Sequence, residues 1–237
     1  MNLLDLIILV LFALGLVIGF KRGIIRQALS TFGTIVSTVC AFLFKTPIAK
    51  FLCMKCPFFS FSGALKGLSV INLFVYEVIA FLVILAILMS LLQLLIFVSK
   101  VLEKIVSLTI IFALPSKIGG AILGLLENYI VVFIILYIIS LPIFDISIIR
   151  ESTLRDKIVN DTPILNNMAK KSIEVGKELA NLMDEYSIKQ NSDEYNLKAL
   201  DIFLKYNITS VETVDALSES GKLQVKNIES VLTNYRD

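Results

Sequence analysis

The sequence predicts an all-α membrane protein with four transmembrane helices and a polar helical C-terminal tail. Of its 237 residues, 57% are hydrophobic, against about 45–50% in a typical soluble domain. Residues 1–144 carry ten Lys or Arg and four acids, whereas residues 145–237 carry twelve Lys or Arg and sixteen acids. The composition therefore divides the chain into a basic four-span transmembrane domain (1–144) and an acidic polar tail (145–237).

Four apolar stretches reach or approach the length that crosses a bilayer, whose hydrocarbon core of about 30 Å needs roughly 20 helical residues. They are Leu3–Phe20, Gln27–Phe44, Val70–Val98 and Ile118–Phe144. The first differs from a secretory signal peptide because it begins with an acid, Asp5, and the basic residues follow the apolar run. We therefore expect it to be retained as the first span.

A fifth apolar run, Ile105–Leu114, has ten residues and is closed by Pro115. It is too short to span the core, so we expect a short interfacial or re-entrant helix that leads into the fourth span.

The tail is expected to form several short helices. Apolar residues recur there every three or four positions, which predicts one apolar face: Leu165, Met168, Val175, Leu179, Leu182 and Tyr186. Thr162-Pro163 suits an N-cap and first turn, Thr209–Glu212 is a capping-box pattern, and Gly221 suits a helix C′ position. A last helix is expected to follow with Val225, Ile228, Leu232 and Tyr235. We expect these faces to pack on each other, on the membrane interface or on a second copy of the chain.

Four spans place both termini on the same side of the membrane, and loop charge sets which side. The loops on one side carry six basic residues, Lys21, Arg22, Arg26, Lys100, Lys104 and Lys117. The other side has seven, Lys45, Lys50, Lys55, Lys66, Arg150, Arg155 and Lys157. Because these counts do not decide, the cluster after the first span is given more weight. It predicts that the termini and the tail are extracytoplasmic.

The sequence lacks the residues that most enzymes and metal sites use. The chain has no His, and three Cys cannot close a four-thiolate zinc site. It also has no paired Asp and no H-E-x-x-H motif. We expect no catalytic residues, no metal and no cofactor. Cys53 and Cys56 form a lone C-x-x-C in what we expect to be a loop, either incidental or, on an oxidising side, a disulfide. The tail, with a net charge of −4, shows no nucleic-acid footprint.

Glycines spaced four apart predict close helix packing in lipid. They are Gly15, Gly19 and Gly23 in and after the first span, and Gly120 and Gly124 in the fourth. We expect Gly19 and Gly23 to form the close contact between the first two spans.

Two polar features could carry function. Lys21, Arg22 and Arg26 follow the first span and, if the turn is helical, Arg22 and Arg26 share a face with Gly19. This face is either a positive-inside anchor or a binding surface for lipid headgroups or an acidic partner. Glu127, followed by Asn128, is the acid deepest in an apolar run. It is either shallow and structurally paired or part of a proton or ion site.

These residues resemble the colicin V production protein (CvpA) family over roughly residues 1–170. Asp5 near the N-terminus and the run Gly19–Gln27 are similar to a family motif G-x-[KR]-[KR]-G-x-x-R-E, with Gln27 where Glu is usual. Lys117–Leu126 resembles the opening of the family's fourth span, where Glu127-Asn128 replaces a basic residue and Gly. The runs 151–154 and 162–165 resemble the tails of Gram-positive members.

The resemblance implies a multi-pass bacterial inner-membrane protein associated with toxin production, toxin export and envelope stress tolerance, and it implies no catalytic residues. We therefore expect a non-enzymatic scaffold or secretion-accessory protein. Its expected partners are the lipid bilayer, other membrane or envelope proteins and a second copy of the chain. The alternative is a small ion- or proton-coupled transporter or channel that uses Glu127.

Overall fold

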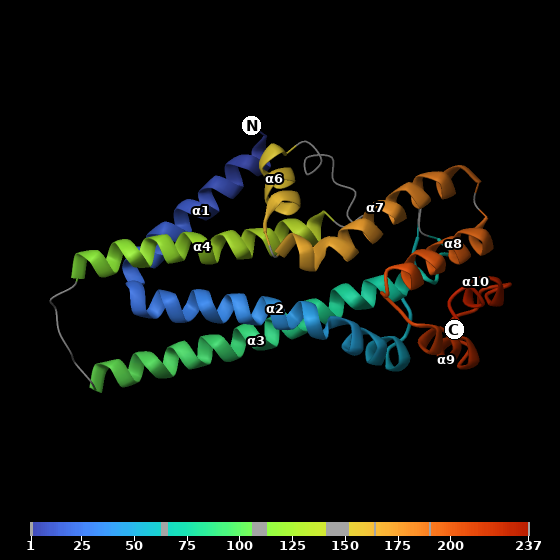
Figure 1. Ribbon diagram of the computed structural model, residues 1–237, viewed down its shortest axis with the longest axis horizontal. Helices are drawn as coiled ribbons and strands as arrows, with labels where there is room; N and C mark the ends of the chain where they lie inside the picture. The colour runs from blue at the N-terminus through green and yellow to red at the C-terminus, as the bar shows by residue number, and fades with distance from the viewer. Residues whose placement is uncertain are drawn as a thin grey trace. The chain divides into compact units, whose positions relative to one another are not determined.

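The computed structural model describes residues 2–62, 66–105, 113–140, 152–163, 165–189 and 191–236. The regular elements of these residues are all α-helices, which confirms the predicted fold class (Figure 1). The chain forms two compact units, and each unit combines segments that are distant in sequence.

Four helices are long and apolar enough to span a membrane, as the sequence predicted. They are α1 (Leu3–Arg22), α2 (Ile24–Lys55), α3 (Ile71–Ile105) and α4 (Ala113–Ile139). The helix α2 continues beyond the predicted end at Phe44 and passes through Pro47. Most of the short run Ile105–Leu114 lies outside the described residues.

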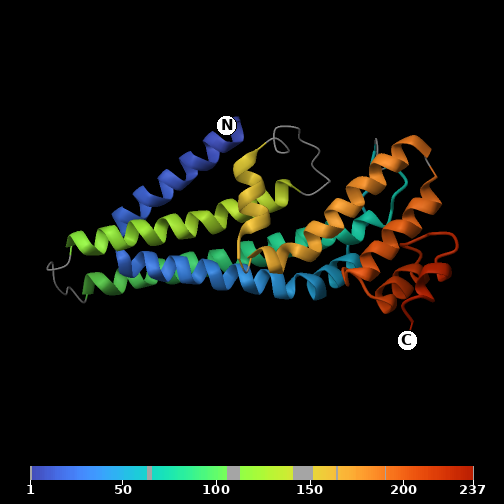
Figure 2. The same cartoon turned by 45° about the horizontal axis from the view of Figure 1, so that its top comes forward.

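The first unit comprises residues 1–42, 83–140 and 144–166. In it α1 packs along α4, and the short helix α6 (Thr153–Asp161) contacts both helices. Figures 1 and 2 show α1 alongside α4, with α6 beside the N-terminal end of α1. The exposed side chains of α1 and α4 are mostly large and apolar, which is the surface that lipid requires.

The second unit comprises residues 43–82, 141–143 and 167–237. Its tail helices are α7 (Leu165–Lys189), α8 (Ser192–Lys205), α9 (Val211–Glu219) and α10 (Glu229–Leu232). They pack against the end of α2, the start of α3 and the connection between these helices. Phe74 of α3 stacks on Phe203 of α8 with ring centroids 6.0 Å apart. The tail therefore has a partner that the sequence did not predict, the segment 43–82.

Asn196 shows how closely this partner is held. Its side-chain oxygen accepts from the Val70 amide at 3.1 Å, and its side-chain nitrogen donates to the Gly67 carbonyl at 2.8 Å. Asn196 is 3% exposed. The amide thus satisfies two backbone groups of the connection between α2 and α3, which have no helical partners of their own.

Three details of the tail differ from the sequence predictions or refine them. Thr162 ends α6 as its C-cap and does not start α7, because its hydroxyl donates back to the Ile158 carbonyl. The N-cap of α9 is Ser210 and not the predicted Thr209; Ser210 makes no side-chain capping bond, and its hydroxyl accepts from Lys50 at 2.9 Å. The predicted C′ glycine, Gly221, has φ +72 after the C-cap Ser220, as expected.

A buried ion pair joins three helices of the second unit. Lys45 Nζ of α2 lies 3.1 Å from Glu77 Oε1 of α3, and it donates to Ser172 Oγ of α7 at 2.6 Å. Glu77 is 3% exposed, and its second oxygen is buried without a hydrogen-bond partner. The ammonium is therefore the main compensation for a carboxylate that is withheld from solvent.

Lys45→Met is expected to destabilise the protein by about 3–5 kcal/mol, because the Glu77 carboxylate would stay buried without its adjacent ammonium. Lys45→Met combined with Glu77→Leu is expected to recover most of this loss, since both charges are then absent. Thermal unfolding in detergent, followed by circular dichroism, measures the effect. Lys55→Met, at an exposed position at the end of α2, is the control. Equal unfolding temperatures for Lys45→Met and Lys55→Met would contradict the assignment.

Candidate functional site

The predicted glycines meet in pairs along two antiparallel helices of the first unit. A Cβ on Gly15 would lie 2.6 Å from the Gly124 carbonyl oxygen, and one on Gly19 would lie 2.1 Å from that of Gly120. Both distances are far inside van der Waals contact, so the backbones touch and only glycine fits. The partner of the first span is therefore the fourth span, and the expected contact of Gly19 with the second span is wrong. A backbone contact needs glycine on both helices, and α4 supplies it.

Gly23 also packs against α4, since a Cβ on Gly120 would lie 2.8 Å from the Gly23 carbonyl carbon, and it has a second role. It is the C-cap of α1 with φ +76, a conformation that L side chains rarely adopt. Since Gly23 separates α1 from α2, the turn is not helical, and the condition under which Arg22 and Arg26 would share a face with Gly19 is not met. The nearby Ile24 amide donates to Ser116 Oγ at 3.2 Å, which closes the same end of the α1–α4 pair.

Beyond the glycine pairs, toward the N-terminal end of α1, polar side chains make the contacts of this helix. The Asn128 side chain donates to the Leu11 carbonyl, one turn beyond the glycine pairs. Asp5 is 1% exposed and accepts from the Asn2 amide at 3.0 Å, from Ser152 Oγ at 2.5 Å and from the Leu154 amide at 3.3 Å. Asp5 thus caps α1 and at the same time anchors the start of α6.

Glu127 projects from α4 toward α2, where three polar side chains surround it. Gln27 Nε2 donates to Oε2, and Ser30 Oγ donates to Oε1 at 2.8 Å. Thr31 Oγ1 lies 3.4 Å from Oε2 and donates to the Leu123 carbonyl at 3.0 Å. We call Glu127, Gln27, Ser30, Thr31 and the Leu123 carbonyl the Glu127 cluster. The sequence pointed to Glu127 but to none of its partners on α2.

These partners belong to a polar stripe on α2. Its residues recur every three or four positions, and each is at most 6% exposed: Gln27, Ser30, Thr31, Thr34, Ser37 and Thr38. The residues between them, such as Phe32 and Val36, are exposed and apolar. In a membrane helix the polar face is the buried face. The same periodicity in the printed sequence could have identified this stripe.

The basic residues lie near the meeting of α1, α2 and α4. Lys21 and Arg22 are exposed, and Arg22 Nη1 donates to Ser30 Oγ at 3.3 Å. Lys117 Nζ of α4 lies 5.7 Å from the centre of the Phe20 ring. Lys117 thus adds a fourth cation to the predicted group of Lys21, Arg22 and Arg26. Anchoring or lipid binding by this group stays a prediction.

The predicted cysteine loop is helical at its start. Cys53 lies within α2 and is buried, Cys56 follows directly after the helix, and both thiols are free. The prediction ended the helix too early, at Phe44. Lys222 of the tail donates to the carbonyls of Cys53 at 3.3 Å and Cys56 at 3.2 Å. An ammonium thus satisfies carbonyls that a helix C-terminus leaves open.

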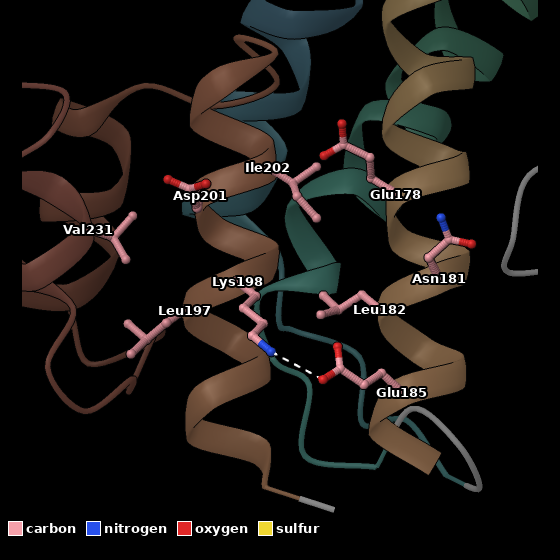
Figure 3. A pocket seen from close by; sticks show the side chains of 9 residues that line it. All are labelled: Glu178, Asn181, Leu182, Glu185, Leu197, Lys198, Asp201, Ile202 and Val231. Atoms are coloured by element: carbon pink, nitrogen blue, oxygen red, sulfur yellow. Dashed lines mark ion pairs between the residues drawn. The ribbon is translucent and has the colours of Figure 1, made fainter. Parts of the chain in front are cut away.

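The second unit also contains a groove between α7, α8 and α10, with a volume of about 520 Å³. Figure 3 shows its lining, which comprises Glu178, Asn181, Leu182, Glu185, Leu197, Lys198, Asp201, Ile202 and Val231. Lys198 pairs with Glu185 at 3.5 Å. Hydrogen bonds from Tyr206 and Lys205 hold the pKa of the Glu178 carboxyl below its usual range. The charged groups of the groove are thus already engaged with neighbours.

The described residues contain no group of three or more His, Cys, Asp or Glu side chains placed to hold a metal ion. The Glu127 cluster has one carboxylate and several neutral oxygen groups, so it is not a group of this kind.

Comparison with known proteins assigns the family. The sequence profile described as colicin V production protein matches residues 4–163, about two thirds of the chain. The chain belongs to the colicin V production protein family. This confirms the resemblance, and the match covers Asp5, both glycine pairs and the Glu127 cluster.

One curated relative is the uncharacterized transmembrane protein YshB of Bacillus subtilis (strain 168). It is 32% identical over 184 residues, which cover 70% of this chain and 94% of the relative. No solved structure matches the chain.

Gly19→Ala and Gly120→Ala are each expected to destabilise the protein by about 1–3 kcal/mol, because the added methyl group meets backbone atoms of the facing helix. Thermal unfolding in detergent and the amount of protein in membranes measure the effect. Ala13→Leu adds more volume at an exposed position of α1 and serves as the control. If both alanine variants unfold at the temperature of Ala13→Leu, the backbones are not in contact.

Proposed function

We propose that this family member is a non-enzymatic accessory or scaffold protein of the bacterial plasma membrane, acting in toxin production or export and in envelope homeostasis. Family membership supports the link to toxin production, since the family is described by that process. The observation that carries the accessory role is the attachment of the polar tail to residues 43–82, within one compact unit.

Several tail helices contribute to this attachment. Lys45 of α2 donates to Ser172 of α7 at 2.6 Å, and Lys50 donates to Ser210 before α9 at 2.9 Å. Asn196 of α8 binds the connection between α2 and α3. Contacts from α7, α8 and the start of α9 hold the tail in a defined arrangement with these membrane-helix segments. A folded polar surface attached to membrane helices suits the capture of a partner protein.

The tail is expected to crosslink to a partner in living cells. A photo-crosslinking amino acid at Lys226, whose side chain is 82% exposed, is expected to capture another membrane or envelope protein. The same amino acid at Leu94, which is exposed on the apolar surface of α3, is the control for contact with lipid.

A deletion strain is expected to lose envelope tolerance or toxin export, and the crosslinked protein is expected to be needed for the same phenotype. A strain with normal tolerance and export, together with no crosslink at Lys226, would refute the accessory role. Ion or proton flux through liposomes that depends on Glu127 would favour the transporter alternative instead.

We further propose that the tail is extracytoplasmic, following the basic cluster after the first span. In a chain whose three native cysteines are replaced by Ala, Lys226→Cys is expected to react with a membrane-impermeant maleimide in intact cells, whereas Lys21→Cys is not. Both positions are exposed, so both are expected to react once the cells are permeabilised. If only Lys21→Cys reacts in intact cells, the tail is cytoplasmic and the proposed orientation is wrong.

A further inference from the structure

Gln27 carries a buried polar atom that no described group satisfies. The residue is 1% exposed, and its Nε2 donates to Glu127 while its Oε1 has no hydrogen-bond partner. An unpaired carbonyl oxygen withheld from water is costly, and in native structures it calls for an explanation. The Gln27 amide belongs to a group of oxygen atoms around one carboxylate, and this composition points to a ligand.

We propose that the Glu127 cluster is a binding site for a monovalent cation of the sodium class. Its oxygen atoms are the two of the Glu127 carboxylate, the hydroxyls of Ser30 and Thr31 and the Leu123 carbonyl. The Gln27 amide turns its nitrogen toward Glu127, so its unpaired oxygen joins this set only when the amide is reversed. Hard cations are bound by oxygen ligands of these kinds. The site is independent of the accessory role, because an accessory protein and a transporter can both hold an ion.

The spacing of these oxygens lies within about 0.6 Å of the spacing around a small cation. Ser30 Oγ lies 2.8 Å from Glu127 Oε1, Thr31 Oγ1 lies 3.4 Å from Oε2, and Thr31 Oγ1 lies 3.0 Å from the Leu123 carbonyl oxygen. Ligands about 2.4 Å from a common centre are roughly 3.4 Å apart when they are at right angles. A half-turn of the Gln27 amide exchanges its nitrogen and oxygen and presents Oε1 to Glu127. The amide then changes from hydrogen-bond donor to cation ligand without moving its chain.

The charge balance selects a monovalent ion. The cluster has one carboxylate, so a divalent ion would leave a net positive charge within the membrane. Among the described residues, the Glu127 carboxylate accepts from neutral side chains and forms no ion pair with a Lys or Arg. The nearby Arg22 guanidinium donates to the Ser30 hydroxyl at 3.3 Å and not to the carboxylate. The segment 83–98 of α3 has no charged residue that could supply a counter-charge.

A second carboxylate in the same chain provides a contrast. Glu77 has the Lys45 ammonium at 3.1 Å, so its counter-charge is part of the protein. Glu127 has neutral oxygen groups at the corresponding distances. A bound cation at Glu127 would supply the charge that Lys45 supplies at Glu77.

The test is direct binding to the purified full chain in lipid nanodiscs, in choline chloride at constant ionic strength. We expect saturable binding of one ²²Na⁺ per chain and an unfolding temperature that rises with NaCl and not with choline chloride. Glu127→Gln is expected to abolish both effects. Thr31→Val keeps the side-chain shape but removes one ligand, and it is expected to weaken binding about tenfold or more.

Thr38→Val is the matched control, because Thr38 is equally buried in the stripe but donates to the Thr34 carbonyl on its own helix. It is expected to bind sodium like the parent. Absence of saturable sodium binding by the folded parent would overturn the proposal, as would equal losses in Thr31→Val and Thr38→Val. A response of the parent to pH but not to sodium, lithium or potassium would show that the carboxylate takes up only a proton, and would also overturn it.

Discussion

The backbone contact between α1 and α4 sets the register on which the first unit depends. Gly15 and Gly19 face Gly124 and Gly120, so the two antiparallel helices are matched turn by turn. One turn further along, Asn128 on α4 can reach the Leu11 carbonyl on α1. Any side chain in place of these glycines would separate the helices and remove that reach. The specific polar contacts are therefore consequences of a contact made by residues without side chains.

The same register decides where Glu127 points. Neighbouring residues on a helix project about 100° apart, so when Asn128 faces α1, Glu127 is turned away from it. It meets the polar stripe of α2, where Gln27 and Ser30 donate to its carboxylate. In lipid, no hydrophobic effect drives the apolar side chains of one helix onto another. Small residues between α1 and α4 and polar residues between α4 and α2 are two ways of holding helices together under that condition.

Features that depend on composition and local spacing could be predicted from the sequence. The four spans, the helical tail and the Gly221 C′ position follow from hydropathy and helix-end chemistry, which one segment determines alone. Prediction failed where partners are distant in sequence. Glycine spacing shows that a helix can pack closely but not against which helix, so Gly19 was assigned to the wrong span. The packing of the tail on residues 43–82 depends on such pairs as Asn196 with Val70, which no local pattern reveals.

The end of α2 shows why hydropathy misplaces the limit of a helix. A prediction from hydropathy ends an apolar stretch before its first charged residue. In α2 this residue is Lys45, and Pro47 follows closely. Hydropathy scores that ammonium as unpaired, yet Glu77 lies 3.1 Å away and Ser172 accepts from it. A paired charge does not require water, so the helix continues to Lys55. There the Lys222 ammonium binds the open carbonyls of Cys53 and Cys56. A helix can therefore extend as far as the groups packed against it satisfy its polar atoms, and in α2 the groups that extend it come from α3 and from the tail.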